Sequence, residues 1–378
     1  MFAWFLWGSI TAFFVNFSPF VLAIILFFTS KERFKLTIFN AACILLISLI
    51  QLYIVREFKL TSFILSLFRI ANICSVLLLN DKDKIKIFYF FTKSISAILA
   101  LSIFGWILFL FGMNLPFYSI QSDYGTYNNF YFFILFVEDS IFSIIPRFSS
   151  IFLEPGYLGM LTSILIVSNR FQFKRKIVLV FLLATIFSFS LAAFLIIIIS
   201  SIIYIISTKK KSIIYLLLFF LLFFVLYKIS VNLNDGENAI YNYLFKRLEF
   251  NNGSISGYNR FSSDLDSYFN NFMSSSDKYF GIGEQEFRKI SWEGGNAGYK
   301  VFLIQYGIVG TTLVFLFYFI LALSKNVKMT WLLFLVYMLI FLQAAYPLIE
   351  SELLLFITAI SFFKAIQTKE KINPKQLV

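Results

Sequence analysis

Long apolar runs dominate this sequence and restrict what the chain can fold into. A membrane-spanning helix needs about 20 mostly apolar residues, and about eleven stretches come close to that length. The pattern predicts an all-α, polytopic membrane helix bundle that forms one integral membrane domain over residues 1–378. The apolar stretches are residues 6–28, 36–55, 60–80, 85–111, 154–169, 177–188, 190–207, 212–229, 299–323, 330–346 and 350–366.

Composition favours the same class and narrows the chemistry. Hydrophobic residues make up 60% of the chain and charged residues 14%, whereas soluble domains have about 45–50% and about 25%. The chain has no histidine, which removes the usual general base and most zinc or iron sites. Cys43 and Cys74 lie inside apolar stretches, so no disulfide is predicted. We expect no metal, no other cofactor and no nucleic-acid partner.

The short basic loops predict how the bundle is oriented. Lys and Arg accumulate in cytoplasmic loops, and with eleven spans all the basic loops fall on one side, with the C-terminus inside. The two apolar stretches around Ser188-Phe-Ser190 are together too long for one span, so this break predicts a tight outer turn. The basic sets are Lys31, Arg33 and Lys35; Lys82, Lys84 and Lys86; Arg170, Lys174, Arg175 and Lys176; Lys209, Lys210 and Lys211; Lys325 and Lys328; and Lys364, Lys369, Lys371 and Lys375.

Two longer segments fall on the opposite, outer side, and they alone have room for a site. The first, 112–153, is a polar and aromatic loop that continues as an apolar stretch broken by Glu138 and Asp139. Because two carboxylates make a full span expensive, we expect an interfacial helix there. The second, 230–298, has apolar residues at helical spacing in two places, which predicts two amphipathic helices in a lid that lies on the membrane over the bundle.

Arg147 and Glu154 stand seven positions apart, just before an apolar stretch. Pro155 is tolerated at the first turn of a helix, so Glu154 is predicted at a helix mouth and Arg147 in the loop before it. An arginine can bind a diphosphate through paired N–H donors, and a carboxylate there could deprotonate a hydroxyl group. The structural alternative is that Glu154 interacts with the helix dipole and pairs with Arg147.

Two further arginines are candidates for the site. Arg260 lies in the second outer segment and could bind phosphate, but it also opens an amphipathic helix, so a lipid phosphate or a loop carboxylate would suit it equally well. Arg69 lies in the middle of an apolar stretch, where a charge is costly and usually faces the bundle interior or water. We therefore expect Arg69 inside the bundle, in a substrate-binding or a structural role.

The end of the second outer segment has residue types that suit a sugar ring. Trp292 offers an aromatic face, Glu293 and Asn296 offer polar side chains beside it, and Tyr299 opens the next apolar stretch. We take these four residues as candidates for substrate binding. The alternative is that Trp292 is an ordinary interfacial anchor, since tryptophan is common at membrane surfaces.

Three stretches, taken together, resemble the Wzy-type O-antigen and capsular polysaccharide polymerases, which share a superfamily with the O-antigen ligases. We call them the arginine stretch (147–159), the hydroxyl turn (184–193) and the glycine stretches (280–283, 295–299 and 305–310). They read Arg147…Phe152-Leu-Glu154-Pro155-Gly156-Tyr-Leu-Gly159; Ala184-Thr-Ile-Phe-Ser188-Phe-Ser190-Leu-Ala-Ala193; and Phe280-Gly-Ile-Gly283, Gly295-Asn296-Ala-Gly-Tyr299 and Gln305-Tyr-Gly307-Ile-Val-Gly310.

The resemblance implies a glycosyltransferase of the bacterial cytoplasmic membrane. Such an enzyme transfers a glycan chain from undecaprenyl diphosphate to a new lipid-linked repeat unit at the outer face, without a nucleotide sugar. Arg147, Glu154 and Arg260 would be its catalytic residues. The implied partners are the lipid-linked glycan and membrane lipid, with a chain-length regulator protein as a further candidate. The ligase branch has a histidine where this chain has Gly295, which argues against a ligase; a lipid-linked oligosaccharide flippase or other transporter is the remaining alternative.

Overall fold

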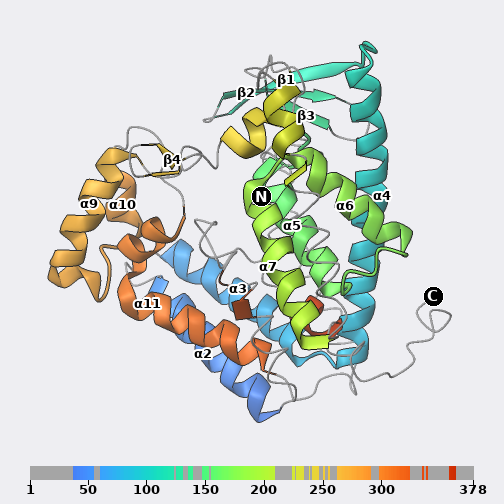
Figure 1. Cartoon of the computed structure of the whole chain (residues 1–378). Helices are drawn as coiled ribbons and strands as arrows, with labels where there is room; N and C mark the ends of the chain where they lie inside the picture. The colour runs from blue at the N-terminus through green and yellow to red at the C-terminus, as the bar shows by residue number, and fades with distance from the viewer. Residues whose placement is uncertain are drawn as a thin grey trace. The chain divides into compact units, whose positions relative to one another are not determined.

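The computed structural model is predominantly helical and falls into two compact units (Figure 1). Unit 1 holds the described residues between Phe90 and Tyr258, and unit 2 holds those before Phe90 and after Tyr258. The structure describes residues 37–54, 60–122, 125–130, 135–138, 147–152, 155–208, 224–225, 227–233, 238, 241–246, 250–251, 254–255, 262–290, 298–323, 334–335, 338 and 357–362.

Unit 1 is built around α5 (Pro155–Ser168), which packs against both α6 (Lys176–Ser188) and α7 (Leu191–Thr208). The long helix α4 (Asp81–Leu110) begins in unit 2 and continues into unit 1. Every residue of α5 from Leu161 to Ser168 is buried. A helix that is apolar on all sides is typical of a position inside a bundle, and α5 occupies that position.

A small antiparallel sheet lies in the segment 112–153, which the sequence predicts to be the first outer segment. It has the order β1 (Phe117–Ser122), β2 (Gly125–Phe130) and β3 (Leu135–Glu138), and its register pairs Ser122 with Gly125 and Tyr127 with Glu138. The sequence predicted an interfacial helix where β3 lies. Aromatic and branched residues have high β propensity, but the outcome depends on cross-strand neighbours. Here β2 supplies the partner that turns an apolar, helix-compatible stretch into a strand.

The segment after α7 also differs from its expected form. Where helical spacing predicted an amphipathic helix near residues 240–248, the structure has a short π-helical turn at Tyr241–Phe245. It is followed by a two-stranded ladder of β4 (Phe250–Asn251) and β5 (Ser254–Ile255). Phe245 is buried and its ring contacts Tyr227 edge-on, so the apolar spacing there reflects local packing of a tight turn.

In unit 2, α2 (Ile38–Ile54) packs against both α3 (Leu60–Leu78) and α11 (Tyr299–Ala322). A compact group formed by α9 (Ser263–Ser274), the 3-10 turn Ser276–Lys278 and α10 (Glu284–Lys289) covers the first part of α11.

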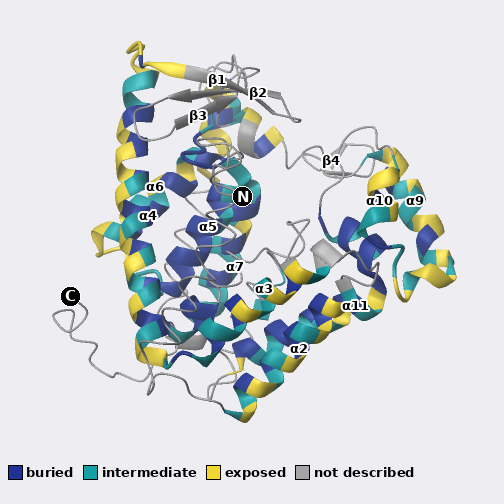
Figure 2. Ribbon diagram, turned by 180° about the vertical axis from the view of Figure 1, so that it is seen from behind, coloured by how far each residue is buried: buried dark blue, intermediate teal, exposed yellow. Residues whose placement is uncertain are grey.

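The amphipathic helix predicted near residues 261–272 is present as α9. It begins where the Ser262 side chain accepts a hydrogen bond from the Leu265 N–H (3.2 Å), the usual role of a helix N-cap. Its apolar face packs on the protein itself, because Leu265 and Phe272 are buried with Phe287, Val301 and Ile304. In Figure 2 the ribbons of α9 and α10 carry both buried and exposed residues.

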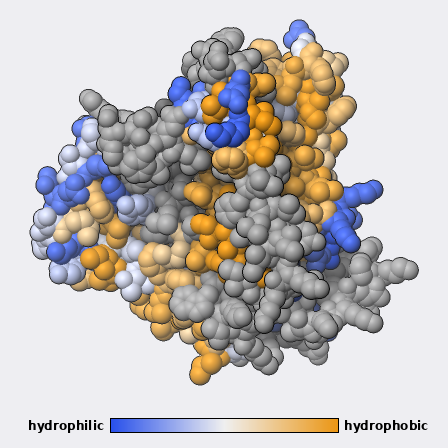
Figure 3. Space-filling model, in the orientation of Figure 1, coloured by the Kyte–Doolittle hydropathy of each residue, from blue (hydrophilic) through white to orange (hydrophobic). Residues whose placement is uncertain are grey.

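Two helices in the described part of the chain, α4 and α11, are long and apolar enough to cross a membrane. The apolar stretches at 36–55, 60–80, 85–111, 154–169, 177–188, 190–207 and 299–323 coincide with α2 to α7 and α11, so their helical form is confirmed. The stretch at 6–28 and most of those at 212–229, 330–346 and 350–366 lie outside the described residues. Large apolar side chains are exposed along these helices, and Figure 3 shows broad hydrophobic surface.

Candidate functional site

The Arg147 side chain lies against the end of α6. Its Nε donates a hydrogen bond to the carbonyl oxygen of Ser188 (3.0 Å), and its Nη2 donates to that of Phe189 (3.4 Å). The last carbonyls of a helix lack partners within the helix and form the negative end of its dipole, so a cation is stabilised there. Arg147 therefore caps α6 and joins the arginine stretch to the hydroxyl turn.

The backbone around Arg147 is fixed by further contacts within unit 1. The Phe148 N–H donates to the carbonyl of Phe187 (3.0 Å), and the buried hydroxyl of Ser150 donates to that of Ser102 on α4 (2.9 Å). Ser150 has a φ of 52°, a left-handed conformation that costs a residue other than glycine about 1–2 kcal/mol. Such strain persists only where surrounding structure imposes it, and it is common at functional sites.

The predicted tight turn at Ser188-Phe-Ser190 is confirmed. Helix α6 ends at Ser188, Phe189 takes a left-handed conformation with a φ of 46°, and α7 begins at Leu191. The Phe189 N–H donates to the carbonyl of Ile186 (3.1 Å). A chain reversal through a single left-handed residue explains why two apolar stretches can follow each other so closely.

Hydroxyl groups fill the space between α5 and the hydroxyl turn. The hydroxyls of Thr162 and Thr185 lie 2.7 Å apart, and Ser163 donates to the carbonyls of Gly159 (2.6 Å) and Ala193 (3.2 Å). All three hydroxyl residues are buried. Small residues and hydroxyls that bond across a contact are typical of helix packing in membranes, so α5 is tied to both neighbours.

Gly159 brings α5 closest to the hydroxyl turn. A Cβ atom at this position would lie 2.7 Å from the Cβ of Ser190, 2.8 Å from the Cβ of Ala193 and 3.0 Å from the hydroxyl of Ser188. By contrast, a Cβ at Gly156 on the same helix would meet no atom within 4 Å. The packing of α5 on the hydroxyl turn therefore requires a glycine at position 159 but not at position 156.

In unit 2, the glycine stretches at 280–283 and 305–310 run together where α11 is broken. Gly307 interrupts the helix with a φ of 65° and a ψ of −173°. The N–H groups of Ile282 and Gly283 donate to the carbonyls of Ile304 (2.8 Å) and Gln305 (2.9 Å), and the Val309 N–H donates to that of Tyr279 (3.0 Å). The backbone groups freed by the break in α11 thus form hydrogen bonds with the segment 279–283.

Only glycine fits at the crossing. Gly281 and Gly307 both have positive φ values, of 73° and 65°. A Cβ at Gly281 would lie 2.5 Å from the carbonyl oxygen of Gln305, and one at Gly307 would lie 2.5 Å from that of Tyr279. The backbones of the two segments therefore touch, with no side chain between them.

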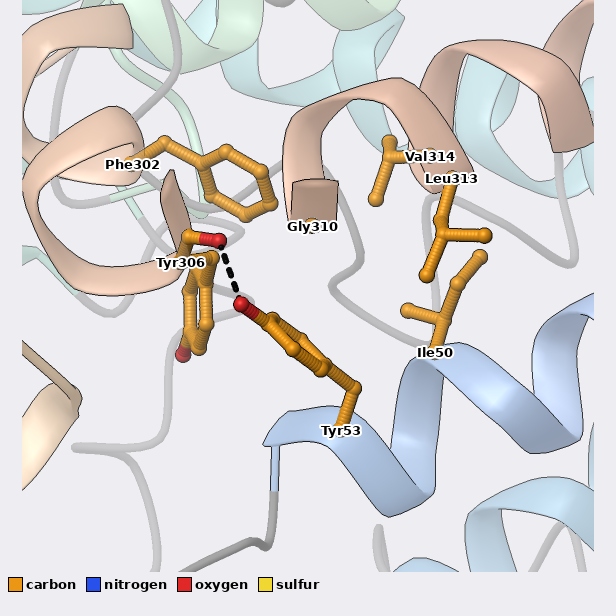
Figure 4. A pocket seen from close by; sticks show the side chains of 7 residues that line it. All are labelled: Ile50, Tyr53, Phe302, Tyr306, Gly310, Leu313 and Val314. Carbon is orange, nitrogen blue, oxygen red and sulfur yellow. Dashed lines mark hydrogen bonds between the residues drawn. The ribbon is translucent and has the colours of Figure 1, made fainter. Parts of the chain in front are cut away.

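Tyr53 holds the crossing from α2. Its hydroxyl lies 2.6 Å from the carbonyl oxygen of Phe280 and 3.0 Å from that of Tyr306, so its proton can bridge both sides of the break. Figure 4 shows Tyr53 reaching from α2 toward the backbone of Tyr306, beside a small apolar pocket. The pocket is lined by Ile50, Tyr53, Phe302, Tyr306, Gly310, Leu313 and Val314.

Gln305 stands beside the break and is fully buried, with 0% of its surface exposed. Neither its amide nitrogen nor its amide oxygen has a hydrogen-bond partner among the residues that the structure describes. A buried polar group without a partner costs about 1–3 kcal/mol. Sequence reasoning placed Gln305 in a glycine stretch without giving it a role, and its burial could not be read from an apolar helix.

Tyr299 begins α11, where it contributes to the contact with α9. Its ring meets that of Phe269 edge-on, with centroids 6.4 Å apart. The neighbouring Lys300 lies 2.7 Å from a carboxylate oxygen of Asp266 and 5.2 Å from the centroid of Phe269. On α9, burial is the main cause that raises the pKa of Tyr268, and the negative charge of Asp277 raises it further. Lys300, next in sequence to the candidate Tyr299, is a cation that the sequence analysis did not single out.

The other candidate residues cannot be joined to these contacts. Glu154, Arg260, Trp292, Glu293 and Asn296 lie outside the described residues. Arg69 is on α3, and its side chain is likewise outside the description. Arg147 belongs to unit 1, and Arg69 and Tyr299 belong to unit 2. Within the described ranges, no group of three or more acidic or cysteine side chains could hold a metal ion.

Comparisons with known proteins found no match for this chain among protein-family models, curated proteins or solved structures.

Proposed function

We propose that this protein is a membrane glycosyltransferase that polymerises oligosaccharide repeat units linked to undecaprenyl diphosphate, at the outer face of the bacterial cytoplasmic membrane. The observation that carries the proposal is the meeting of the arginine stretch and the hydroxyl turn. Arg147 bonds to Ser188 and Phe189, and Gly159 packs on Ser190. These are two of the stretches on which the resemblance depends, so their contact supports a common functional role.

The proposed reaction needs a group that stabilises a departing diphosphate. A hydroxyl of the acceptor sugar forms a bond to the anomeric carbon of the donor glycan, the bond from that carbon to the diphosphate oxygen breaks, and the hydroxyl proton passes to a base. We assign Arg147 to the diphosphate and Glu154 to the proton. A cation that binds the leaving group more strongly as charge develops accelerates the reaction.

The contacts of Arg147 also define the competing explanation. A guanidinium can bind carbonyl oxygens through one edge and phosphate oxygens through another, because its five donors form a rigid fork. If Arg147 only caps α6, its removal should reduce activity through loss of stability alone. A variant that disturbs the packing of α6 without touching the arginine separates the two roles, and Thr162→Val is suitable because Thr162 on α5 bonds to Thr185 on α6.

The test uses full-length protein in lipid nanodiscs with lipid-linked repeat units, and it measures both glycan chain length and thermal stability. We expect Arg147→Ala to lower the polymerisation rate on the order of 10²–10³-fold, as for a lost oxyanion donor, and Arg147→Lys to lie between alanine and wild type. Thr162→Val should lose stability but keep long chains. Equal activity of Arg147→Ala and Thr162→Val at matched stability would contradict the catalytic role.

A lipid-linked oligosaccharide transporter is the second candidate, and the break in α11 favours it. Many transporters bind substrate at discontinuous helices near the middle of the membrane, and Gln305 lies buried beside this break. The backbone groups at the break, however, bond to the segment 279–283. Proteoliposomes distinguish the two functions: new glycosidic bonds made by the purified protein support the polymerase, and movement of intact repeat units without such bonds supports the transporter.

A further inference from the structure

The turn between α5 and α6 presents a compact basic surface. We call residues 170–176 the basic turn. Arg170 and Phe171 both have a φ of 53°, and their N–H groups donate to the carbonyls of Val167 (2.8 Å) and Ile166 (3.2 Å), which closes the end of α5. The Arg175 N–H donates to the carbonyl of Gln172 (2.9 Å). Hydrogen bonds therefore fix the backbone that presents the basic side chains.

Three cations of the basic turn, Lys174, Arg175 and Lys176, have no counter-ion in the part of the chain that the structure describes. Lys174, Arg175 and Lys176 are exposed, and none makes an ion pair or a side-chain hydrogen bond to a described residue. The cations of α10 differ, because Arg288 and Lys289 are exposed but each is paired with a glutamate on the same helix. The charge of Lys174, Arg175 and Lys176 is thus accessible to a ligand from outside.

An apolar stripe begins three residues after the last of these cations. Leu179, Leu183 and Ile186 on α6 are exposed by 42%, 43% and 40%, and their spacing places them on one face of the helix. Phe173 within the basic turn is exposed by 41%. Figure 3 shows hydrophilic surface directly beside hydrophobic surface at the right-hand edge, where Figure 1 draws the start of α6.

We propose that the basic turn binds anionic glycerophospholipids through the phosphates of their headgroups. A stripe of apolar side chains fits the acyl chains, and a cluster of cations at its end lies where the phosphate layer of a membrane begins. Arg175 can bind a phosphate through paired donors while the lysines act as point charges. Phe173 occupies the interface, as aromatic residues commonly do. The proposal requires only that α6 contacts lipid and is independent of the glycosyltransferase activity.

The chain offers a matched pair of variants for the test. Lys174→Gln with Arg175→Gln removes one lysine and one arginine from the basic turn, and Arg288→Gln with Lys289→Gln removes the same two residue types from α10. Purified full-length protein in a neutral detergent is titrated with phosphatidylglycerol and, separately, with phosphatidylcholine. Bound lipid is counted by native mass spectrometry, and elution as a single species by size exclusion confirms that each variant is folded.

We expect saturable binding of phosphatidylglycerol that weakens on the order of tenfold in the variant of the basic turn and less than twofold in the α10 variant. Phe173→Ala should weaken lipid binding further. Equal binding of the two lipids, or equal losses in the two double variants, would overturn the proposal. So would displacement of the lipid by millimolar inorganic phosphate, which would identify the surface as a site for free phosphate.

Discussion

The turn after α6 and the break in α11 both interrupt helices among apolar residues, but different groups satisfy the freed backbone. At the turn, side chains act: Arg147 donates to two carbonyls, and the hydroxyls of Thr162 and Ser163 bond across the helix contact. At the break, backbone bonds predominate: N–H groups of 282 and 283 bond to α11, glycine allows the approach, and one side-chain hydroxyl, that of Tyr53, bridges the two segments. The first arrangement can be weakened gradually by side-chain changes, whereas the second admits no side chain at Gly281 or Gly307.

The largest effect is expected for Gly307→Ala. The positive φ and a Cβ only 2.5 Å from the carbonyl oxygen of Tyr279 combine two costs, about 1–2 kcal/mol for the left-handed backbone and about 1–3 kcal/mol for overpacking. We expect a loss of about 2–5 kcal/mol in the free energy of unfolding, measured in mixed micelles. Gly156→Ala is the control, because its Cβ meets nothing within 4 Å. Wild-type stability of Gly307→Ala would mean that the two backbones do not touch.

A smaller loss, of about 1–3 kcal/mol by overpacking, is expected for Gly159→Ala. Here the new Cβ meets the Cβ atoms of Ser190 and Ala193, so a second substitution can relieve part of the clash. We expect Gly159→Ala with Ala193→Gly to recover part of the lost unfolding free energy. A comparable rescue is not available at Gly307, where the obstacle is backbone. Strict additivity of the two changes at Gly159 and Ala193 would contradict the close packing of α5.

Tyr53→Phe should cost about 1–2 kcal/mol, because the carbonyls of Phe280 and Tyr306 lose a shared donor while the ring still fills its place. The loss is measured as a lower free energy of unfolding. If the hydroxyl is part of the mechanism that keeps the break closed, hydrogen exchange at Gly283 and Val309 should also accelerate. Unchanged exchange at these amides would show that the backbone bonds suffice alone.

The smallest effect is expected for the hydroxyl pair between α5 and α6. Thr162→Val and Thr185→Val each remove one partner of a 2.7 Å contact, and each should cost about 1 kcal/mol. A double-mutant cycle isolates their interaction, which we expect to be about 0.5–1 kcal/mol for neighbours in one network. A coupling energy of zero would indicate that each hydroxyl is satisfied by its own helix, through the carbonyls of Leu158 and Phe181.

Sequence patterns predicted the features that depend on neighbouring residues. The apolar stretches gave α2 to α7 and α11, and the small polar break at Ser188-Phe-Ser190 gave the turn. Helical spacing also predicted α9, but the prediction placed its apolar face on a membrane, whereas that face packs on α10 and α11. A membrane and the side of α11 are equally apolar partners. The spacing of residues within one helix carries no information about the surface opposite it.

The features that were missed depend on residues far apart in the chain. Gly281 and Gly307 have meaning only as a pair, and Tyr53 reaches both flanking carbonyls from a helix more than 200 positions earlier. The candidate site was predicted less completely than the fold for the same reason. Arg147 was singled out from the sequence as a catalytic candidate, but its contact with the carbonyl of Ser188 follows from the left-handed conformation of Phe189, which an aromatic residue seldom takes.

The short length of α6 has a consequence for the membrane around it. Helix α6 has 13 residues, which at 1.5 Å per residue is about 20 Å, well below the hydrocarbon thickness of about 30 Å. A bilayer adapts to a short apolar length by thinning locally. Lipid phosphates would then descend toward the level of Arg147, and a glycan carrier would have less distance to cover. Reconstitution in lipids of increasing acyl length should therefore progressively slow the proposed polymerisation, and a rate indifferent to bilayer thickness would show that α6 is shielded from lipid.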